Sequence, residues 1–153
     1  MFTYKEIVTL FKQAAFDHLM IQDFGYGQLS DIKTRNESAN GDQEVNYPYM
    51  FLNPTTHQRQ TSAVTYQFNM IMMDMARDEE GDKYDNFLTI QSNCQQYCDD
   101  VIAHLWNAAG KPDMQLTVTY TPFVERFQDE LAGMTAAISI QVPMPINDCI
   151  APF

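Results

Sequence analysis

The sequence predicts an α+β fold, in which a mainly antiparallel sheet packs against a long amphipathic helix and an N-terminal helix. Apolar residues recur with helical spacing at the start of the chain and again over residues 83–109. Strand-like alternation fills the stretch between these helices and follows the second one. Runs of adjacent strands broken by a helix are typical of α+β proteins. The 153 residues suffice for one domain with a core, so we expect a single domain over 1–153.

The first predicted helix covers residues 3–19, where apolar side chains recur at steps of three and four up to Leu19. Thr3 and Glu6 have the spacing of a capping box, which predicts the start of the helix. The next segment is rich in turn residues. Gly25 and Gly27 predict a turn, and residues 28–33 a short strand. We expect a mobile loop near residues 25–44.

Two strands are predicted next. Residues 45–52 are aromatic, and Pro48, which lacks an N–H group, places this strand at an edge or a bulge. Residues 61–75 alternate between the two faces of a strand. This run is longer than the usual strand of about five or six residues, so we predict that it bends or projects from its sheet. One face of this strand is fully apolar, and it carries Val64, Tyr66, Phe68, Met70 and Met72.

The second helix, residues 83–109, carries one apolar stripe that we expect to face the sheet. Gly110 and Pro112 end it. Two alternating strands follow, centred on residues 116–120 and 136–142, with residues 123–133 as their link. Prolines at 143, 145 and 152 predict an extended tail over 143–153. The stripe of the helix consists of Phe87, Ile90, Cys94, Tyr97, Cys98, Val101, Ile102 and Leu105.

Composition excludes several classes of function. The formal charge is −11 and the nine Lys and Arg are scattered, which argues against tight binding of nucleic acid. Three cysteines are too few for a disulfide scaffold, and neither a signal peptide nor a membrane-length apolar run is visible. We therefore expect synthesis and retention in a reducing cytoplasm, with no membrane as a partner.

No set of residues predicts catalysis, a cofactor or a metal. Cys94 and Cys98 are four apart on a helix, but zinc requires four ligands and no histidine pattern supplies the others. The acidic segment 78–82 lacks the calcium-loop pattern, so we interpret it as a solvated turn before a helix. No nucleophile motif of a hydrolase is present. We therefore expect that the chain is not an enzyme.

Apolar residues near the strand ends and in the tail are the candidates for contacts with other subunits. Methionine-rich segments adapt to many partners, although burial inside the chain's own sheet explains them equally well. The candidate contact residues are Met70, Met72, Met73, Met75, Phe123, Phe127, Ile150 and Phe153.

Two segments carry a resemblance to a known group of proteins. The first is residues 47–54, followed by a long strand, an acidic turn and a long helix. The second comprises residues 123–133, the strand that ends at Pro143, and Cys149. With the element order, these segments resemble tail-terminator or neck (head-to-tail connector) proteins of tailed bacteriophages. The similarity is closest to phages of the Bacteroidetes type, including crAss-like ones.

The resemblance implies a virion structural protein, made in the cytoplasm of the bacterial host. Such a protein forms an oligomeric ring of roughly six to twelve copies in the neck or at the tail end. Its partners are neighbouring portal, neck or tail proteins, and DNA passes through as cargo that is not specifically bound. Two alternatives stay open from the residues alone: a small soluble protein- or ligand-binding module without catalysis, and a hydrolase whose site is scattered through the fold.

Overall fold

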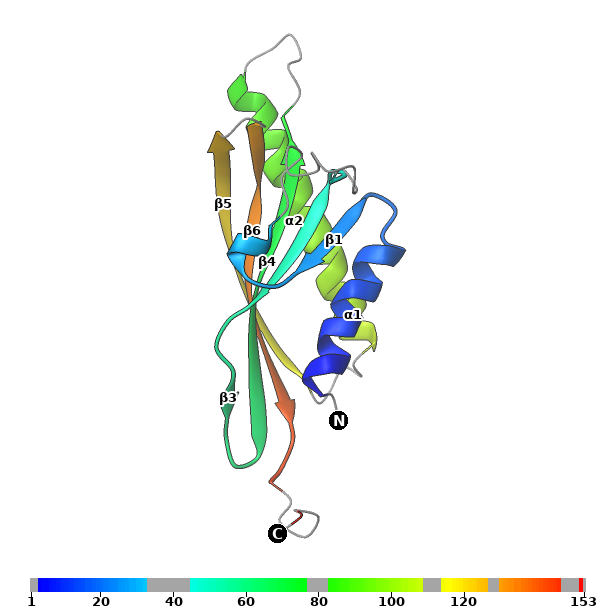
Figure 1. Ribbon diagram of the computed structural model, residues 1–153, viewed down its shortest axis with the longest axis vertical. Helices are drawn as coiled ribbons and strands as arrows, with labels where there is room; N and C mark the ends of the chain where they lie inside the picture. Colours follow the sequence, from blue (N-terminus) through cyan, green and yellow to red (C-terminus); the bar gives the residue numbers. More distant parts are fainter. Residues whose placement is uncertain are drawn as a thin grey trace.

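The computed structural model describes residues 3–32, 45–76, 83–108, 114–126, 130–146 and 152, with the backbone alone at 83, 84, 125, 126 and 130. Two helices accompany one mixed sheet whose strands lie in the order β1-β2-β4-β6-β5, with β3 paired to one end of β4 (Figure 1). Of the strand pairs that the structure describes, β1–β2 is parallel and the others are antiparallel. The α+β prediction is confirmed. The elements are α1 (Tyr4–Asp17), β1 (Asp23–Tyr26), the 3-10 helix η1 (Leu29–Asp31), β2 (Tyr49–Pro54), β3 (Gln58–Arg59), β4 (Ala63–Met75), α2 (Lys83–Ala108), β5 (Gln115–Arg126) and β6 (Glu130–Pro143).

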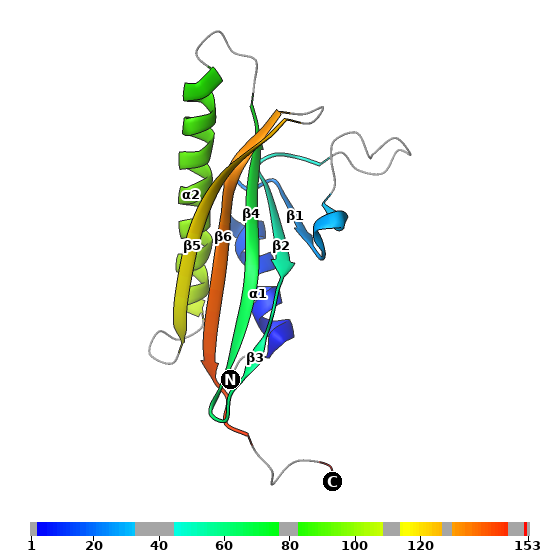
Figure 2. The same ribbon diagram turned by 90° about the vertical axis from the view of Figure 1, so that its left-hand side faces the viewer.

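Both helices cover the same face of the sheet (Figure 2). The predicted stripe of α2 contributes Cys94, Cys98, Val101 and Leu105 to the main core, and Phe87 is also buried. They meet the predicted apolar face of β4, where Phe68, Met70 and Met72 are buried. The pattern arises because the 3.6-residue helical period and the two-residue strand period each collect apolar side chains on one side.

The capping box of α1 is confirmed. The Glu6 N–H donates to Thr3 Oγ1 at 3.3 Å, and the Thr3 N–H donates to Glu6 Oε2 at 2.6 Å. The helix ends at Asp17, short of the predicted Leu19, whose side chain is 92% exposed.

The segment between α1 and β4 corrects several predictions. Gly25 lies inside β1, where a turn was expected, and η1 replaces the strand predicted for residues 28–33. Pro48 precedes β2, so its missing N–H removes no bond from the ladder. The strand β2 is therefore interior, between β1 and β4, and neither at an edge nor at a bulge. Residues 33–44 of the predicted loop lie outside the described part of the chain.

The strands β5 and β6 run further than the sequence predicted. Their pairing continues from Gln115↔Gln141 to Arg126↔Glu130, so the predicted link 123–133 is mostly strand. The reason is a second, smaller core on the face away from the helices, against which Phe123 packs and in which Leu131 is buried. Its buried residues are Val45, Tyr49, Phe51, Met73 and Leu131.

The strand β4 projects beyond the helices, as its length predicted (Figure 1). Its far end forms a hairpin with β3, and the chain after β6 continues beside the turn. The Met144 N–H donates to Ser62 O at 3.0 Å, and the Ile146 N–H to Thr61 O at 3.1 Å. The predicted tail thus begins as an extended segment held by backbone hydrogen bonds. Residues 147–151 and 153 lie outside the described part.

Candidate assembly surfaces

The methionines predicted as contacts lie mostly inside the molecule. Met70 and Met72 are fully buried in the main core, and Met73 is buried in the smaller one. Met75 and Phe123 are half-buried against that smaller core. Because the chain's own packing covers these side chains, the surfaces described below do not include them. Phe127, Ile150 and Phe153 lie outside the described residues.

The two described cysteines are unsuited to nucleophilic or metal chemistry. Burial raises the pKa of the Cys94 thiol to about 12, and it raises the pKa of Cys98 as well. Both sulfurs are thus protonated at neutral pH, whereas reaction and metal binding need the thiolate. Among the residues that the structure describes, no three His, Cys, Asp or Glu side chains gather closely enough to hold a metal ion.

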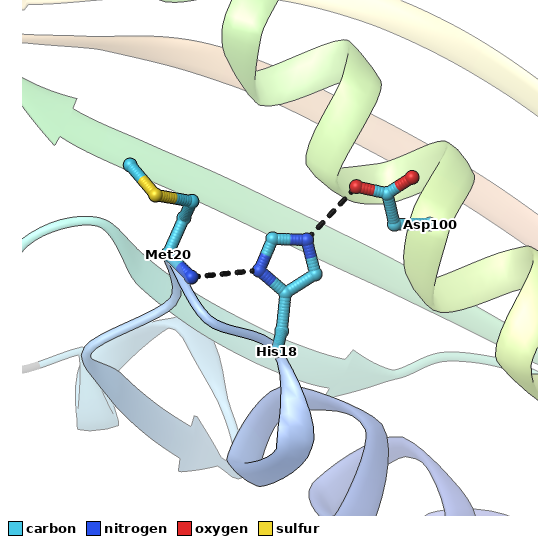
Figure 3. A network of polar contacts seen from close by, with 3 residues as sticks. All are labelled: His18, Met20 and Asp100. Carbon is cyan, nitrogen blue, oxygen red and sulfur yellow. Dashed lines mark hydrogen bonds and ion pairs between the residues drawn. The ribbon is translucent and has the colours of Figure 1, made fainter.

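His18, at the end of α1, links this helix to α2 by hydrogen bonds (Figure 3). Its Nδ1 accepts the Met20 backbone N–H at 3.0 Å, so the ring hydrogen is on Nε2, which donates to Asp100 Oδ2 at 2.9 Å. A histidine beside a carboxylate resembles a catalytic pair, but a general base needs its second nitrogen for the substrate or nucleophile. Here a backbone amide occupies that nitrogen, so the arrangement is structural.

His57 is held in a similar way within an aromatic cluster. Its ring centroid lies 4.8 Å from that of Tyr4 and 5.3 Å from that of Tyr66. Its Nδ1 accepts the Gln67 backbone N–H at 3.4 Å, and burial lowers the pKa of the ring. The cluster attaches the start of α1 to β4 because Tyr4 also stacks on Phe68.

The strand β5 forms one lateral edge of the sheet. It is 12 residues long, and no strand of the described part pairs with its outer side. One backbone group near its end has a partner on α2: Gln91 Nε2 donates to Phe123 O at 3.1 Å. The rest of the strand offers backbone groups of the kind that pair with another strand.

The face of the sheet away from the helices is here called the open face. Rows of three residues cross β5, β6 and β4 on this face, for example Thr117, Ser139 and Gln67. Between the smaller core and the β3–β4 turn, none of the side chains described on these three strands of the open face is charged. They are Thr65, Gln67, Asn69, Gln115, Thr117, Thr119, Thr121, Thr135, Ala137, Ser139 and Gln141.

Exposed apolar side chains gather at the two lateral sides of the molecule. Beside the end of α1, Phe16 is 84% and Leu19 92% exposed, and Met20 is exposed too. On the other side, Leu88 of α2 is 51% exposed and Val124 of β5 is 38% exposed. Single exposed apolar residues are common, whereas groups of them often mark contact sites. The sequence contained a signal for the first group, since Phe16 falls off the apolar stripe of its helix.

No family model matches the chain, and no curated protein matches it. In the described residues, no helix has both the length and the apolar character that a membrane span requires.

Proposed function

We propose that this protein is a virion structural subunit that forms an oligomeric ring in the neck or at the tail end of a tailed phage. The ring closes or joins the tube through which DNA passes. The observation that carries the proposal is the open outer edge of β5, which extends over 12 residues. Proteins that stay monomeric usually keep edge strands short, charged or covered, because an open edge recruits other chains.

The side chains of β5 also suit an assembly contact. Leu116, Val118 and Tyr120 pack against the main core, which holds the strand rigid. Thr117, Thr119 and Thr121 are exposed and uncharged. A rigid, uncharged edge can accept a neighbour without desolvating a charge, which is the costly step in burying polar surface.

The electrostatics suit DNA as cargo. Among the described residues, the open face carries no lysine or arginine, and the whole chain has a formal charge of −11. DNA-binding proteins retain DNA by neutralising phosphates with clustered cations. A ring built from this chain would therefore let DNA pass without holding it.

Two histidines and two cysteines of the described residues have roles in the fold. His18 and His57 each accept a backbone N–H at one ring nitrogen, and Cys94 and Cys98 are buried thiols. Acyl transfer needs a free base or a reactive thiol, so these four groups favour the structural function over a hydrolase.

Light scattering coupled to size exclusion tests the proposal, with electron microscopy of the same fractions. One chain is 17.6 kDa, so a ring of six to twelve copies has a mass of about 105 to 210 kDa and an annular projection. A Thr119→Lys variant charges the edge and should lose the ring, whereas the exposed Thr55→Lys control, on the loop after β2, should keep it. A 17.6 kDa particle at every concentration would contradict the ring and favour the binding module.

A further inference from the structure

We propose that the contact between copies is head-to-tail: the outward face of α1 in one copy docks on the α2–β5 side of the next. The inference rests on the proposed function and assigns the side-chain contacts between copies. The backbone groups of the β5 edge are a separate part of the interface, because the interior of a helix has no free backbone groups to pair with them. The two lateral sides of the sheet differ, because α1 flanks the β1 side while β5 is the opposite edge (Figure 1). Each side has its own exposed apolar group and its own charge.

The outward face of α1 combines positive charge with an apolar end. Lys5, Thr9, Lys12 and Phe16 follow one another at alternating steps of four and three, so they share one face, and all four are exposed. Neither lysine has an ion-pair partner among the described residues. Leu19 and Met20 extend the apolar end beyond the helix.

A hollow of about 400 Å³ opens beside this face. It is lined by Ala15, Phe16, Ile21 and Phe24 and by the polar side chains of Lys12, Gln22 and Asp23. The Asp23 carboxylate accepts the backbone N–H groups of Phe24 and Asn46. A protruding aliphatic side chain can fill an apolar hollow beside an exposed phenylalanine. The positive charge of this face comes from Lys5 and Lys12 on α1.

The α2–β5 side has the complementary character. The hydrogen bond from Gln91 to the Phe123 carbonyl holds α2 beside β5. Leu88 lies one turn before Gln91 on α2, and Val124 follows Phe123 on β5. Both apolar side chains are exposed. Asp85, a further turn earlier, is exposed and has no ion-pair partner in the described part of the chain. Among the side chains that the structure describes, this side thus presents two exposed aliphatic groups and the carboxylate of Asp85.

Charge decides between the two possible pairings. Two α1 faces in contact would bring lysines against lysines, and two α2–β5 sides would bring Asp85 against its copy. Like charges opposed across an interface are costly, whereas opposite charges favour and orient the contact. Unlike faces therefore pair, and such heterologous contacts form a ring when the rotation between copies closes.

Mixing two blocked variants tests this pairing. Lys12→Glu with Phe16→Ser disables the α1 face, and Leu88→Ser with Val124→Ser disables the α2–β5 side. All four side chains are exposed, and circular dichroism should report an unchanged fold. We expect each variant alone to run as a 17.6 kDa monomer where the wild type assembles. An equimolar mixture should stop at a dimer of about 35 kDa. One variant keeps an intact α2–β5 side and the other keeps an intact α1 face, so each pair can form a single contact.

Two further measurements separate the possible failures. Lys12→Glu alone should weaken assembly, and Asp85→Lys in the same chain should restore it. Leu29→Ser removes an exposed leucine outside both faces and should keep the ring mass. If the wild type assembles but both blocked variants keep its mass, or their mixture stays monomeric, the head-to-tail contact is wrong while the ring survives. A wild type that never assembles overturns both.

Discussion

His18 and His57 show how single residues take part in the fold. Each ring accepts a backbone N–H at Nδ1, and each joins α1 to another element: His18 reaches Asp100 on α2, and His57 packs between Tyr4 and Tyr66. Buried or half-buried polar atoms need such partners. These roles could not be predicted from the sequence, because each depends on a residue distant in the chain.

Leu105 tests the docking of α2 on the sheet. It is 1% exposed, so Leu105→Ala removes a buried side chain and leaves a cavity, at a cost of about 2 to 5 kcal/mol in the free energy of unfolding. Urea denaturation measures the change. Leu29→Ala is the matched control, since that leucine is exposed on η1, and it should change stability by less than about 0.5 kcal/mol. Equal effects would place this side of α2 in solvent.

Tyr4 gives the fold a dependence on alkaline pH. Burial, and then the hydrogen bond with the Tyr26 hydroxyl, raise the pKa of Tyr4 from 10.0 to about 12. The folded state therefore favours the protonated phenol. Its contribution to stability is complete below pH 10 and is lost as the pH rises to about 12.

Urea denaturation at a series of pH values checks this. Tyr4→Phe should flatten the decline in unfolding free energy over that interval. Tyr26→Phe, which removes the hydrogen bond but leaves Tyr4 buried, should flatten it less. An identical decline in Tyr4→Phe and the wild type would show that other groups cause it.

Among the elements, those with long regular patterns were predictable and those fixed by tertiary context were not. The stripe of α2 and the alternation of β4 each repeat often enough to define a face. The strand β1 has four residues, and it forms because β2 supplies a parallel partner from outside its own sequence. The extension of β5 past Phe123 likewise depends on the smaller core, which brings together side chains from several segments.

Substitution of Gly133 tests how closely β6 approaches the backbone of β4. It lies in β6 between β4 and β5, and a Cβ placed there would overlap the carbonyl oxygen of Met72. Gly133→Ala therefore requires a backbone shift, and we expect a loss of about 1 to 3 kcal/mol in urea denaturation. Ala137→Ser, exposed on the same strand, is the control. Without the overlap, alanine would stabilise the chain by limiting its unfolded state, so a gain would contradict this packing.

For the whole molecule, the sequence predicted the class of fold but not the surfaces through which it is proposed to assemble. Three of the four methionines chosen from the sequence, Met70, Met72 and Met73, are buried in the chain's own cores. Burial in a sheet and burial against a subunit give the same sequence pattern. The exposed groups at Phe16 and Leu88 emerge only once the helices are placed on the sheet. The proposed contact joins two opposite lateral sides of the molecule, and these are built from segments far apart in the sequence. No single segment could therefore predict it.

Removal of residues 147–153 tests whether the C-terminal tail takes part in assembly. The hydrogen bonds of Met144 and Ile146 with the β3–β4 turn remain, so the shortened chain should keep its circular dichroism spectrum and Tm. Its self-association in light scattering should weaken, since Ile150 and Phe153 are predicted contacts. Deletion from residue 144 onwards is the comparison, and it should lower Tm because both hydrogen bonds are lost. Unchanged association after the shorter deletion would remove the tail from the contact.

The central place of β6 sets the order in which the chain can fold. It lies between β4 and β5, yet β4 ends at Met75 and β6 begins only at Glu130. During synthesis β4 emerges from the ribosome long before its main partner, while β5 and β6 emerge together and can form a hairpin locally. Folding should therefore proceed by docking that hairpin onto β4, and the distant pairing makes this the slow step. Until then the apolar face of β4 needs α2, or a chaperone, as a cover.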